Sequence, residues 1–251
     1  MRKILTILFT GLSLFVHAQQ TEVRKISAKP SGISISTGIQ AKIVKSNKNV
    51  VVLDAQNQSQ LDKIETKVEK GILIIRVKRN SNIQNSRNLN ATVYINPSLS
   101  SIEISSAGYL EIIAPLDVRI LKIDLSTAGA LKTNKISTGK MSIDASSAAK
   151  FASNNIKVNE LIIEASSASS ILLAGSSSKT SIDAITNAHV NTAKVRTKSV
   201  SAQARTGAKI KVQAKDSLRA TASSGASITY TGYPKTTNFE KSSDGTINNA
   251  N

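Results

Sequence analysis

Acidic side chains recur at a regular interval in the second half of the sequence, each between two apolar residues. Two carboxylates on neighbouring strands could act as the acid and base of glycoside hydrolysis, or they could bind calcium. If the intervals stack, however, one acid per interval places like charges about 5 Å apart, which is unfavourable without cations between them. We therefore interpret these acids as a solvated outer face, relieved by lysines such as Lys122. The members of this acidic column are Glu103, Asp124, Asp144, Glu164 and Asp183.

Basic side chains gather nearer the C-terminus, where the acidic column ends. Only Asp216 opposes them, so a rod built from this sequence would be strongly basic towards its C-terminal end. We hypothesise that this end contacts an anionic surface, such as lipopolysaccharide phosphates or acidic glycans. The alternative is that these residues only keep a rod soluble and protect its sheet faces. The members of this basic cluster are Lys194, Arg196, Lys198, Arg205, Lys209, Lys211, Lys215 and Arg219.

Few other residues offer catalytic or metal-binding chemistry. The chain has no cysteine, so we expect no disulfide and no thiol-linked lipid. Of its two histidines, His17 lies in the N-terminal apolar segment, which leaves His189. One histidine cannot build a zinc site without further ligands, and it completes no convincing Ser–His–Asp set. The sequence therefore predicts no catalytic, metal-binding or cofactor-binding residue.

A four-residue phrase returns throughout the same half of the chain. Its third residue recurs at intervals of 18–21 residues, and a fixed period of this size indicates stacked repeats. Serines and threonines can form hydroxyl ladders in such a stack. We attribute the small third residue to a tight corner that would exclude a larger side chain. The copies begin at Ser105, Ser126, Ser146, Ser166, Thr186, Arg205, Ser223 and Ser242.

This alignment makes two detailed predictions about the fifth copy. His189 takes the position that Gly108 and Gly129 occupy in the first two copies. One residue more than usual stands between Ile182 and Thr186, so we expect a β-bulge at 182–185.

The residues in front of each phrase alternate between apolar and polar. Ile102, Ile123, Ile143, Ile163 and Ile182 each precede an acid, and another apolar residue follows that acid. A period of two is typical of a strand with one buried face. We therefore predict an all-β fold, a single-stranded parallel β-helix with coils of about 20 residues. A β-sandwich of many short strands is the alternative, although it would not need identical residues at a constant spacing.

The chain divides into three predicted parts. Residues 1–18 have a charged start, an apolar run and a small-residue cleavage site after Ala18, which is typical of a signal peptide. A membrane anchor is the alternative, but the run is shorter than the roughly 18 residues that a span needs. Residues 19–98 form a less regular N-terminal β portion, and residues 99–251 form the regular repeats with a polar C-terminal cap at 242–251.

The N-terminal β portion lacks the strong repeat, but its pattern of residues still predicts strands. Residues 36–38 resemble a degenerate copy of the phrase. Residues 61–70 suit either a helical turn or, at 64–68, a strand. The strands are expected at 32–44, 50–53 and 71–77, and a polar loop at 80–90.

Composition narrows the class of partner. The formal net charge is +17, which favours anionic partners. Aromatic residues make up only 3% of the chain, and two phenylalanines lie in the predicted signal peptide. Binding of single-stranded nucleic acid usually relies on stacking aromatic side chains, so nucleic acid is disfavoured. No long apolar stretch follows the signal peptide, so no transmembrane span is expected in the exported protein.

The phrase at 223–227, Ser-Ser-Gly-Ala-Ser, and its upstream variants resemble the repeat of the autotransporter-adhesin head domain family, also called the GIN domain. The order of the segments 38–44, 50–53, 61–77 and 93–97 is similar to that of the family as well. The resemblance implies a right-handed parallel β-helix, exported in bacteria with two membranes, without catalytic residues. The chain departs from the family's pattern in having Ala for Gly in the early phrases and in being basic.

These observations lead to one predicted function and two alternatives. We expect an exported, non-catalytic β-solenoid of the periplasm, the outer cell surface or the extracellular space, which adheres to or binds anionic partners. The first alternative is a β-helix enzyme acting on polysaccharide, either a lyase or a glycosidase. The second is a self-associating scaffold, against which the polar segment 242–251 argues because it would cap the open end of the rod.

Overall fold

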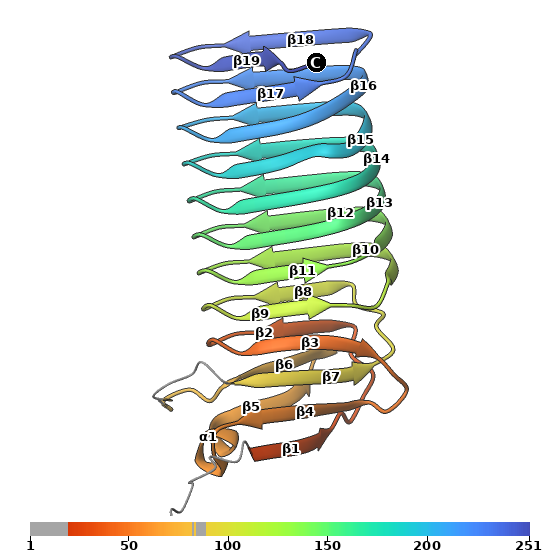
Figure 1. The fold of residues 1–251 in the computed structure, drawn as a ribbon, viewed down its shortest axis with the longest axis vertical. Helices are drawn as coiled ribbons and strands as arrows, with labels where there is room; N and C mark the ends of the chain where they lie inside the picture. Colours follow the sequence, from red (N-terminus) through yellow and green to blue (C-terminus); the bar gives the residue numbers. More distant parts are fainter. Residues whose placement is uncertain (1–19, 82, 84–88) are drawn as a thin grey trace, which may run out of the picture.

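A computed structural model of the protein describes residues 20–81, 83 and 89–251. The predicted signal peptide 1–18, and residues 82 and 84–88 of the predicted polar loop, lie outside the described residues. The described chain forms one continuous sheet of 19 strands that winds into a rod, with one short helix near its N-terminal end (Figure 1). The predicted parallel β-helix is confirmed, with about seven turns.

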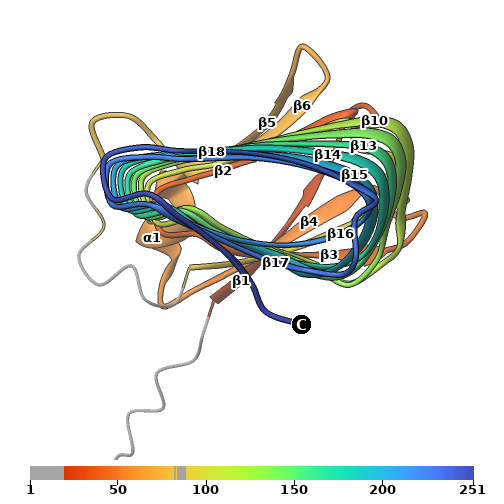
Figure 2. The same ribbon diagram turned by 90° about the horizontal axis from the view of Figure 1, so that it is seen from above.

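Each coil has two broad faces, joined on one side by a tight corner and on the other by a rounded edge (Figure 2). The first broad face contains three whole strands, β2 (Gly32–Ile35), β8 (Ser101–Ile104) and β18 (Thr236–Lys241). It also contains the C-terminal parts of six longer strands: β10 (Leu116–Leu125), β12 (Ile136–Ala145), β13 (Lys150–Ala165), β14 (Ser170–Ala184), β15 (His189–Ala204) and β16 (Lys209–Ala222). The second broad face contains β3 (Gln40–Lys45), β9 (Tyr109–Ile112), β11 (Ala130–Thr133), the N-terminal parts of β13 to β16, β17 (Ser227–Thr231) and β19 (Thr246–Asn249).

We call the rounded side the edge face. It consists of the stacked segments 116–118, 136–138, 156–158, 175–177 and 195–197. Seen from the C-terminal end, the chain runs counter-clockwise from the second broad face over the edge face to the first, while it climbs towards the viewer (Figures 1 and 2). The coil is therefore right-handed, as parallel crossover connections almost always are.

The isoleucine column predicted from the sequence is a vertical file in the core. Ile123 pairs with Ile102 on one side and with Ile143 on the other, and Ile163 continues the file to Ile182. All five side chains are buried. Burying one such side chain contributes roughly 1.5–3 kcal/mol, so this file is a main source of stability in a chain without disulfides.

The four-residue phrase forms the tight corner. Its second and third residues both have left-handed backbone conformations, as at Ser147 (φ 52°) and Ala148 (φ 62°). The N–H of the fourth residue donates to the carbonyl oxygen of the first, as from Ala149 to Ser146 over 3.1 Å. The predicted steric reason for a small third residue is wrong, because Ala107, Ala128 and Ala148 are exposed. The third position is limited by its left-handed backbone conformation and not by lack of space, and the residues that fill it are Ala, Asn, Asp and Gly.

Two details predicted for the fifth copy are corrected by the strand register. The left-handed pair is Thr186 and Asn187, so the phrase begins at Ile185, one residue earlier than the sequence alignment placed it. The predicted bulge at 182–185 is wrong, since Ile182 and Asp183 pair in unbroken register with Ala202 and Gln203. His189 is the first residue of β15 and pairs with Ser170 and Lys209, so it does not occupy the glycine position of the phrase.

The N-terminal coils stack in a different order from the sequence. β2 lies between β6 (Ile72–Val77) and β8, and β3 lies between β7 (Asn90–Ile95) and β9. The first coil of the chain is thus second in the rod. At the N-terminal end of the rod, β4 (Val50–Ala55) runs antiparallel to both β7 and the terminal strand β1 (Gln20–Lys25). The segment 36–38 is a corner like the others, because Gly38 donates its N–H to the carbonyl oxygen of Ser106.

Both interpretations of residues 61–70 hold in part. Helix α1 (Gln58–Lys63) is capped by Asn57, whose side chain accepts from the N–H of Gln60 over 3.0 Å. The chain then turns into β5 (Ile64–Glu69), which pairs antiparallel with β6.

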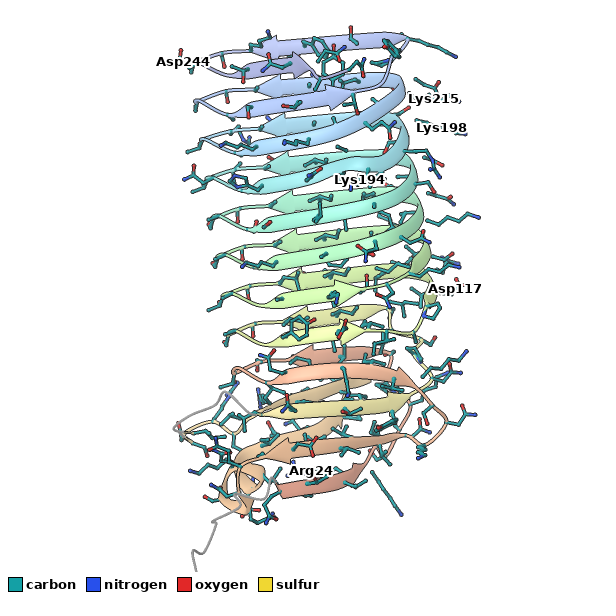
Figure 3. All side chains as sticks on the ribbon, in the orientation of Figure 1. Arg24, Asp117, Lys194, Lys198, Lys215 and Asp244 are labelled. Carbon is teal, nitrogen blue, oxygen red and sulfur yellow. The ribbon has the colours of Figure 1, made fainter. Side chains whose placement is uncertain are left out.

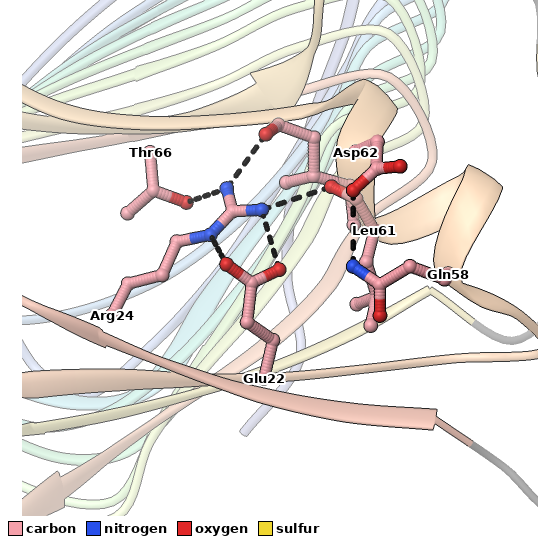
Figure 4. A network of polar contacts seen from close by, with 7 residues as sticks. Glu22, Arg24, Gln58, Leu61, Asp62 and Thr66 are labelled. Atoms are coloured by element: carbon pink, nitrogen blue, oxygen red, sulfur yellow. Dashed lines mark hydrogen bonds and ion pairs between the residues drawn. The ribbon is translucent and has the colours of Figure 1, made fainter.

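Arg24 ties the terminal strand β1 to this helix and to β5 (Figure 4). Its guanidinium donates to both carboxylate oxygens of Glu22 at 2.9 Å. It also donates to the carbonyl oxygens of Leu61 and Ile64 at 2.9 and 2.6 Å, and to the hydroxyl of Thr66 at 3.2 Å. These bonds satisfy carbonyls at the C-terminal end of α1, and so stabilise the N-terminal end of the rod.

At the C-terminal end, the polar segment predicted as a cap is part of the last coil itself. Residues 242–245 form a further corner, and β19 pairs in parallel with β17. In β18, Phe239 stands in register with buried Ala220 and packs on the ring of Tyr230 at 5.5 Å. Larger and more polar side chains in the terminal coil thus cover the core where no further coil follows in the described chain.

Candidate ligand-binding groove

The acidic column lies on neighbouring strands of the first broad face, as its spacing predicts. Asp124 pairs with Glu103 and Asp144, and Glu164 pairs with Asp144 and Asp183. Lys122 contacts Asp124 over 3.1 Å, and this hydrogen bond raises the pKa of Lys122. Within the described residues, no group of three or more acidic, histidine or cysteine side chains is arranged to hold a metal ion. All five acids of the column are partly or fully exposed, so the column is a charged outer face.

The basic cluster is divided among the faces of the rod. Arg205, at a corner, forms a two-pronged ion pair with Asp183 (2.8 and 2.9 Å), and Arg219 on the first broad face pairs with Glu240 at 3.3 Å. Lys209 and Lys211 belong to the second broad face, where they pair in register with His189 and Asn191. The remaining four residues lie on or beside the edge face: Lys194, Arg196, Lys198 and Lys215.

A groove runs over the edge face near its C-terminal end, with a cavity volume of about 590 Å³. Arg196, Lys198 and Lys215 line it, together with Lys157 from two coils earlier. Figure 3 shows Lys198 and Lys215 one above the other on this side of the rod, opposite the corner that carries Asp244. We call this feature the edge groove. It brings together three of the eight residues of the predicted basic cluster and adds a lysine that the sequence did not single out.

The missed lysine follows from strand register. Asp117, Ser137, Lys157, Ser176 and Arg196 are paired successively across the coils, so they form one outward-facing file. In the sequence, Lys157 stands well outside the basic cluster and two coils before Arg196. Only the repeat length could have revealed that the two cations share a file.

The floor of the groove is formed by buried residues whose polar groups are satisfied within the protein. Val158 and Ala214 contribute apolar surface. Ser177 donates its hydroxyl to the carbonyl oxygen of Lys179 over 2.7 Å, and Thr197 donates to that of Val195 over 3.3 Å. The polar side chains that face a ligand therefore include the cations of the wall, the amides of Asn159 and Gln213, and the hydroxyls of Ser176 and Ser178.

Tyr233 closes the C-terminal end of the groove and exposes 84% of its surface. Its position is set by the preceding residue, Gly232, whose φ of 93° and close approach to the carbonyl oxygen of Ala214 leave no room for a side chain. The Asn251 side chain accepts from the N–H of Gly232 over 2.7 Å and donates to its carbonyl oxygen over 2.9 Å. The exposed ring therefore projects from a fixed backbone.

The cations of the edge groove are not neutralised by acids in the described part of the chain. Among the described residues, no carboxylate forms an ion pair with Lys157, Arg196, Lys198 or Lys215. The neighbouring Asp216 faces Lys235 instead, at 3.8 Å. A second hollow of about 450 Å³ extends the groove towards the N-terminus, where Asp117 and Arg119 balance each other in charge. The positive potential of the edge face therefore rises towards the C-terminal coils.

Comparison with known protein families gives a direct match. The family described as "Putative auto-transporter adhesin, head GIN domain" matches residues 29–234. The chain belongs to this family. The resemblance predicted from the phrase and the lead-in segments is thereby confirmed, and it extends over both the N-terminal coils and the edge groove. No curated protein matches the chain.

Solved structures of similar proteins show the same fold at low sequence identity. A "putative adhesin" from Parabacteroides merdae ATCC 43184 is 16% identical, with a TM-score of 0.79 over 93% of this chain and 96% of the other. A "putative lipid binding protein" from Parabacteroides distasonis ATCC 8503 is 17% identical, with a TM-score of 0.79 over 93% and 97%. A "putative adhesin" from Bacteroides fragilis NCTC 9343 is 16% identical, with a TM-score of 0.68 over 93% and 97%.

The described part of the chain contains one helix, α1. None of the helical structure there has the length and hydrophobicity that crossing a bilayer requires.

Proposed function

We propose that the protein is an exported adhesion or binding module that recognises anionic partners and has no catalytic activity. Membership of the adhesin family supports a role in binding. The anionic preference is supported mainly by a set of cations on the edge face and the second broad face that lack ion-pair partners in the described chain. The net charge of +17 for the whole sequence supports it as well. Lys194, Arg196, Lys198 and Lys215 belong to this set, as do Lys209 and Lys211.

A non-catalytic role fits the chemistry of the edge groove. Hydrolysis of a glycosidic bond by most glycosidases needs two carboxyl groups on either side of the bond, and the described residues that line the groove include no Asp or Glu. His189 donates from Nδ1 to the backbone carbonyl oxygen of Asn187 (2.9 Å) and lies on the second broad face. The acids of the first broad face form a file of like charges away from the groove, and two of them are engaged by Lys122 and Arg205.

Binding to immobilised ligands tests the proposal. The mature chain is passed over lipopolysaccharide, an acidic polysaccharide and a neutral polysaccharide of similar length, at low and at high salt. We expect retention on the two anionic supports only, and elution as salt shortens the screening length to about 3 Å near 1 M. Equal retention on the neutral support, or retention that does not change with salt, would contradict an anionic preference. Release of shortened or unsaturated sugar products would instead support a polysaccharide-acting enzyme.

Export is tested separately. The apolar run of residues 1–18 and the small residues before Gln19 support cleavage after Ala18. N-terminal sequencing of the protein from fractionated cells should find a chain that begins at Gln19, in the periplasmic, outer-membrane or extracellular fraction. Protease treatment of intact cells then separates a periplasmic location from an external one. A full-length chain that begins at Met1 in the cytoplasmic fraction would refute export.

A further inference from the structure

We propose that the edge groove is the binding site for an acidic glycan, a saccharide chain that carries carboxylate, sulfate or phosphate groups. This inference rests on the proposed function and deepens it by assigning one site and one class of ligand. It distinguishes the cations of the edge groove from the other exposed cations, and the sequence alone does not make this distinction.

The first argument is the arrangement of charge. Arg196 and Lys198 project from the same coil, Lys215 from the next one, and Lys157 from two coils earlier. With about 4.8 Å between paired strands, these cations extend over three coil steps, on the order of 14 Å. A single small anion cannot contact cations spread over this length, whereas an extended ligand with several charges can contact all of them.

The second argument is the combination of surfaces inside the groove. Val158 and Ala214 supply an apolar floor, Ser176 and Ser178 supply hydroxyls, and Tyr233 supplies a broad exposed ring at one end. A sugar has apolar C–H faces, hydroxyl groups and, in an acidic glycan, negative charges. The groove offers a complementary surface for each of these features.

The third argument is shape, which disfavours the other anionic partners. The four cations line a concave groove on a narrow side of the rod, whereas a bilayer surface contacts the most projecting side chains of a broad face. Among the described residues, Tyr233 is the only aromatic one that lines the groove, and single-stranded nucleic acid usually stacks successive bases on several rings.

Two variants with the same change in net charge test the site. Arg196→Gln, Lys198→Gln and Lys215→Gln together remove three cations of the groove. Lys150→Gln, Lys209→Gln and Lys211→Gln together remove three exposed cations of the second broad face, and no ion pair of the described chain involves them. Binding of an oligogalacturonate is measured by calorimetry for both variants and the parent chain, after equal thermal midpoints have established that all three are folded.

We expect the groove variant to bind the oligogalacturonate roughly tenfold more weakly than the parent, and the broad-face variant to lose less than about twofold. Tyr233→Ala should weaken binding roughly threefold or more, and Tyr233→Phe should restore it because the ring is retained. The fully methyl-esterified oligosaccharide, which is neutral, should not bind detectably.

Several outcomes would overturn the inference. If both triple variants lose affinity equally, binding is a diffuse effect of net charge, and the proposed anionic preference stands without this site. If the parent binds phosphatidylglycerol vesicles but not the oligogalacturonate, the partner is a lipid surface and the groove is not a glycan site. If the parent binds no anionic probe, the inference and the anionic preference both fail. Should the groove triple variant not fold, Lys198→Glu alone, compared with Lys209→Glu, makes the same distinction.

Discussion

The backbone N–H of Ala128 donates a hydrogen bond over 2.8 Å to the carbonyl oxygen of Ser147, which lies at the same corner of the next coil. Equivalent bonds join the corners from Gly38 to Ser243, so one ladder runs along this side of the rod. Each corner has two left-handed residues, which cost about 1–2 kcal/mol each unless they are glycine, and its one bond to the next coil offsets about 0.5–1.5 kcal/mol of that cost. The corners are therefore held together along the rod by backbone hydrogen bonds.

Replacing Ala148 tests whether the corner is limited by backbone conformation. Ala148→Gly should stabilise the protein by about 0.5–1 kcal/mol, since glycine adopts φ 62° without steric cost. Ala148→Val should destabilise it, because a β-branched side chain disfavours this conformation. Urea denaturation gives both values. As a control, Ala152→Gly within strand β13 should cost about 0.5–1 kcal/mol, and a loss of stability in Ala148→Gly as well would contradict the explanation.

Two neighbouring isoleucines in β13 test the register of the core file. Ile163 is buried between Ile143 and Ile182, whereas Ile162 is only partly buried and pairs with Ser142 and Ser181 on the outer side. Ile163→Ala should cost about 2–5 kcal/mol through lost burial and a residual cavity, and Ile162→Ala less than about 1 kcal/mol. Thermal and urea denaturation of the two variants measure the difference. Similar losses would mean that the strand does not present one face to the core.

Two glycines with positive φ distinguish the energetic cost of a steric clash from the cost of the backbone conformation itself. A Cβ on Gly175 (φ 137°) would lie 2.1 Å from the carbonyl oxygen of Ile156, whereas a Cβ on Gly225 (φ 69°) would meet nothing within 4 Å. Gly175→Ala should therefore destabilise the protein by roughly 2 kcal/mol or more, and Gly225→Ala by at most about 1 kcal/mol. Thermal denaturation ranks the two variants. The reverse order would show that the edge face is not packed as closely as we describe.

Relief of like-charge repulsion is expected within the acidic column. Asp144 lies between Asp124 and Glu164 on adjacent strands, so Asp144→Asn should raise the thermal midpoint slightly at low salt. The gain should shrink near 1 M salt, where the screening length is about 3 Å. Asp117→Asn removes the same charge outside the column and should give no such gain. A fall in the midpoint of Asp144→Asn at low salt would indicate that the column binds a cation.

The N-terminal end of the rod should depend on pH through Glu22. The hydrogen bond from Arg24 holds the pKa of Glu22 below its ordinary value of 4.5, with desolvation opposing the shift. A lowered pKa in the folded state means that this stability is complete above the unfolded-state pKa and is lost as the pH falls through the folded-state pKa.

Glu22→Gln should therefore lower the thermal midpoint by roughly 2 °C at neutral pH, and the parent and the variant should converge as the pH falls below the folded-state pKa of Glu22. Glu240→Gln serves as the control, because its ion pair with Arg219 is more exposed and should contribute less. A difference between the parent and Glu22→Gln that stayed constant from neutral to strongly acidic pH would exclude the carboxylate as the source.

The regular coils could be predicted from the sequence because each one repeats its neighbour. In a parallel stack, equivalent positions of successive repeats become hydrogen-bonded partners, so Ile123 and Ile143, or Asp124 and Asp144, are aligned by spacing alone. The same method failed by one residue at His189, where Ile185 replaced the expected serine and the phrase could not be recognised.

The N-terminal coils and the edge groove were decided by tertiary structure. β2 pairs with both β6 and β8, which are separated from it by long segments without the regular repeat, and local sequence does not encode such long-range pairing. In the same way, the winding of the coils brings Lys157 to Arg196 and Lys215, while it leaves Lys209 and Lys211 on another face. The sequence determines which residues stack, since that depends only on repeat length; how a coil bends around its edge determines which charges share a groove.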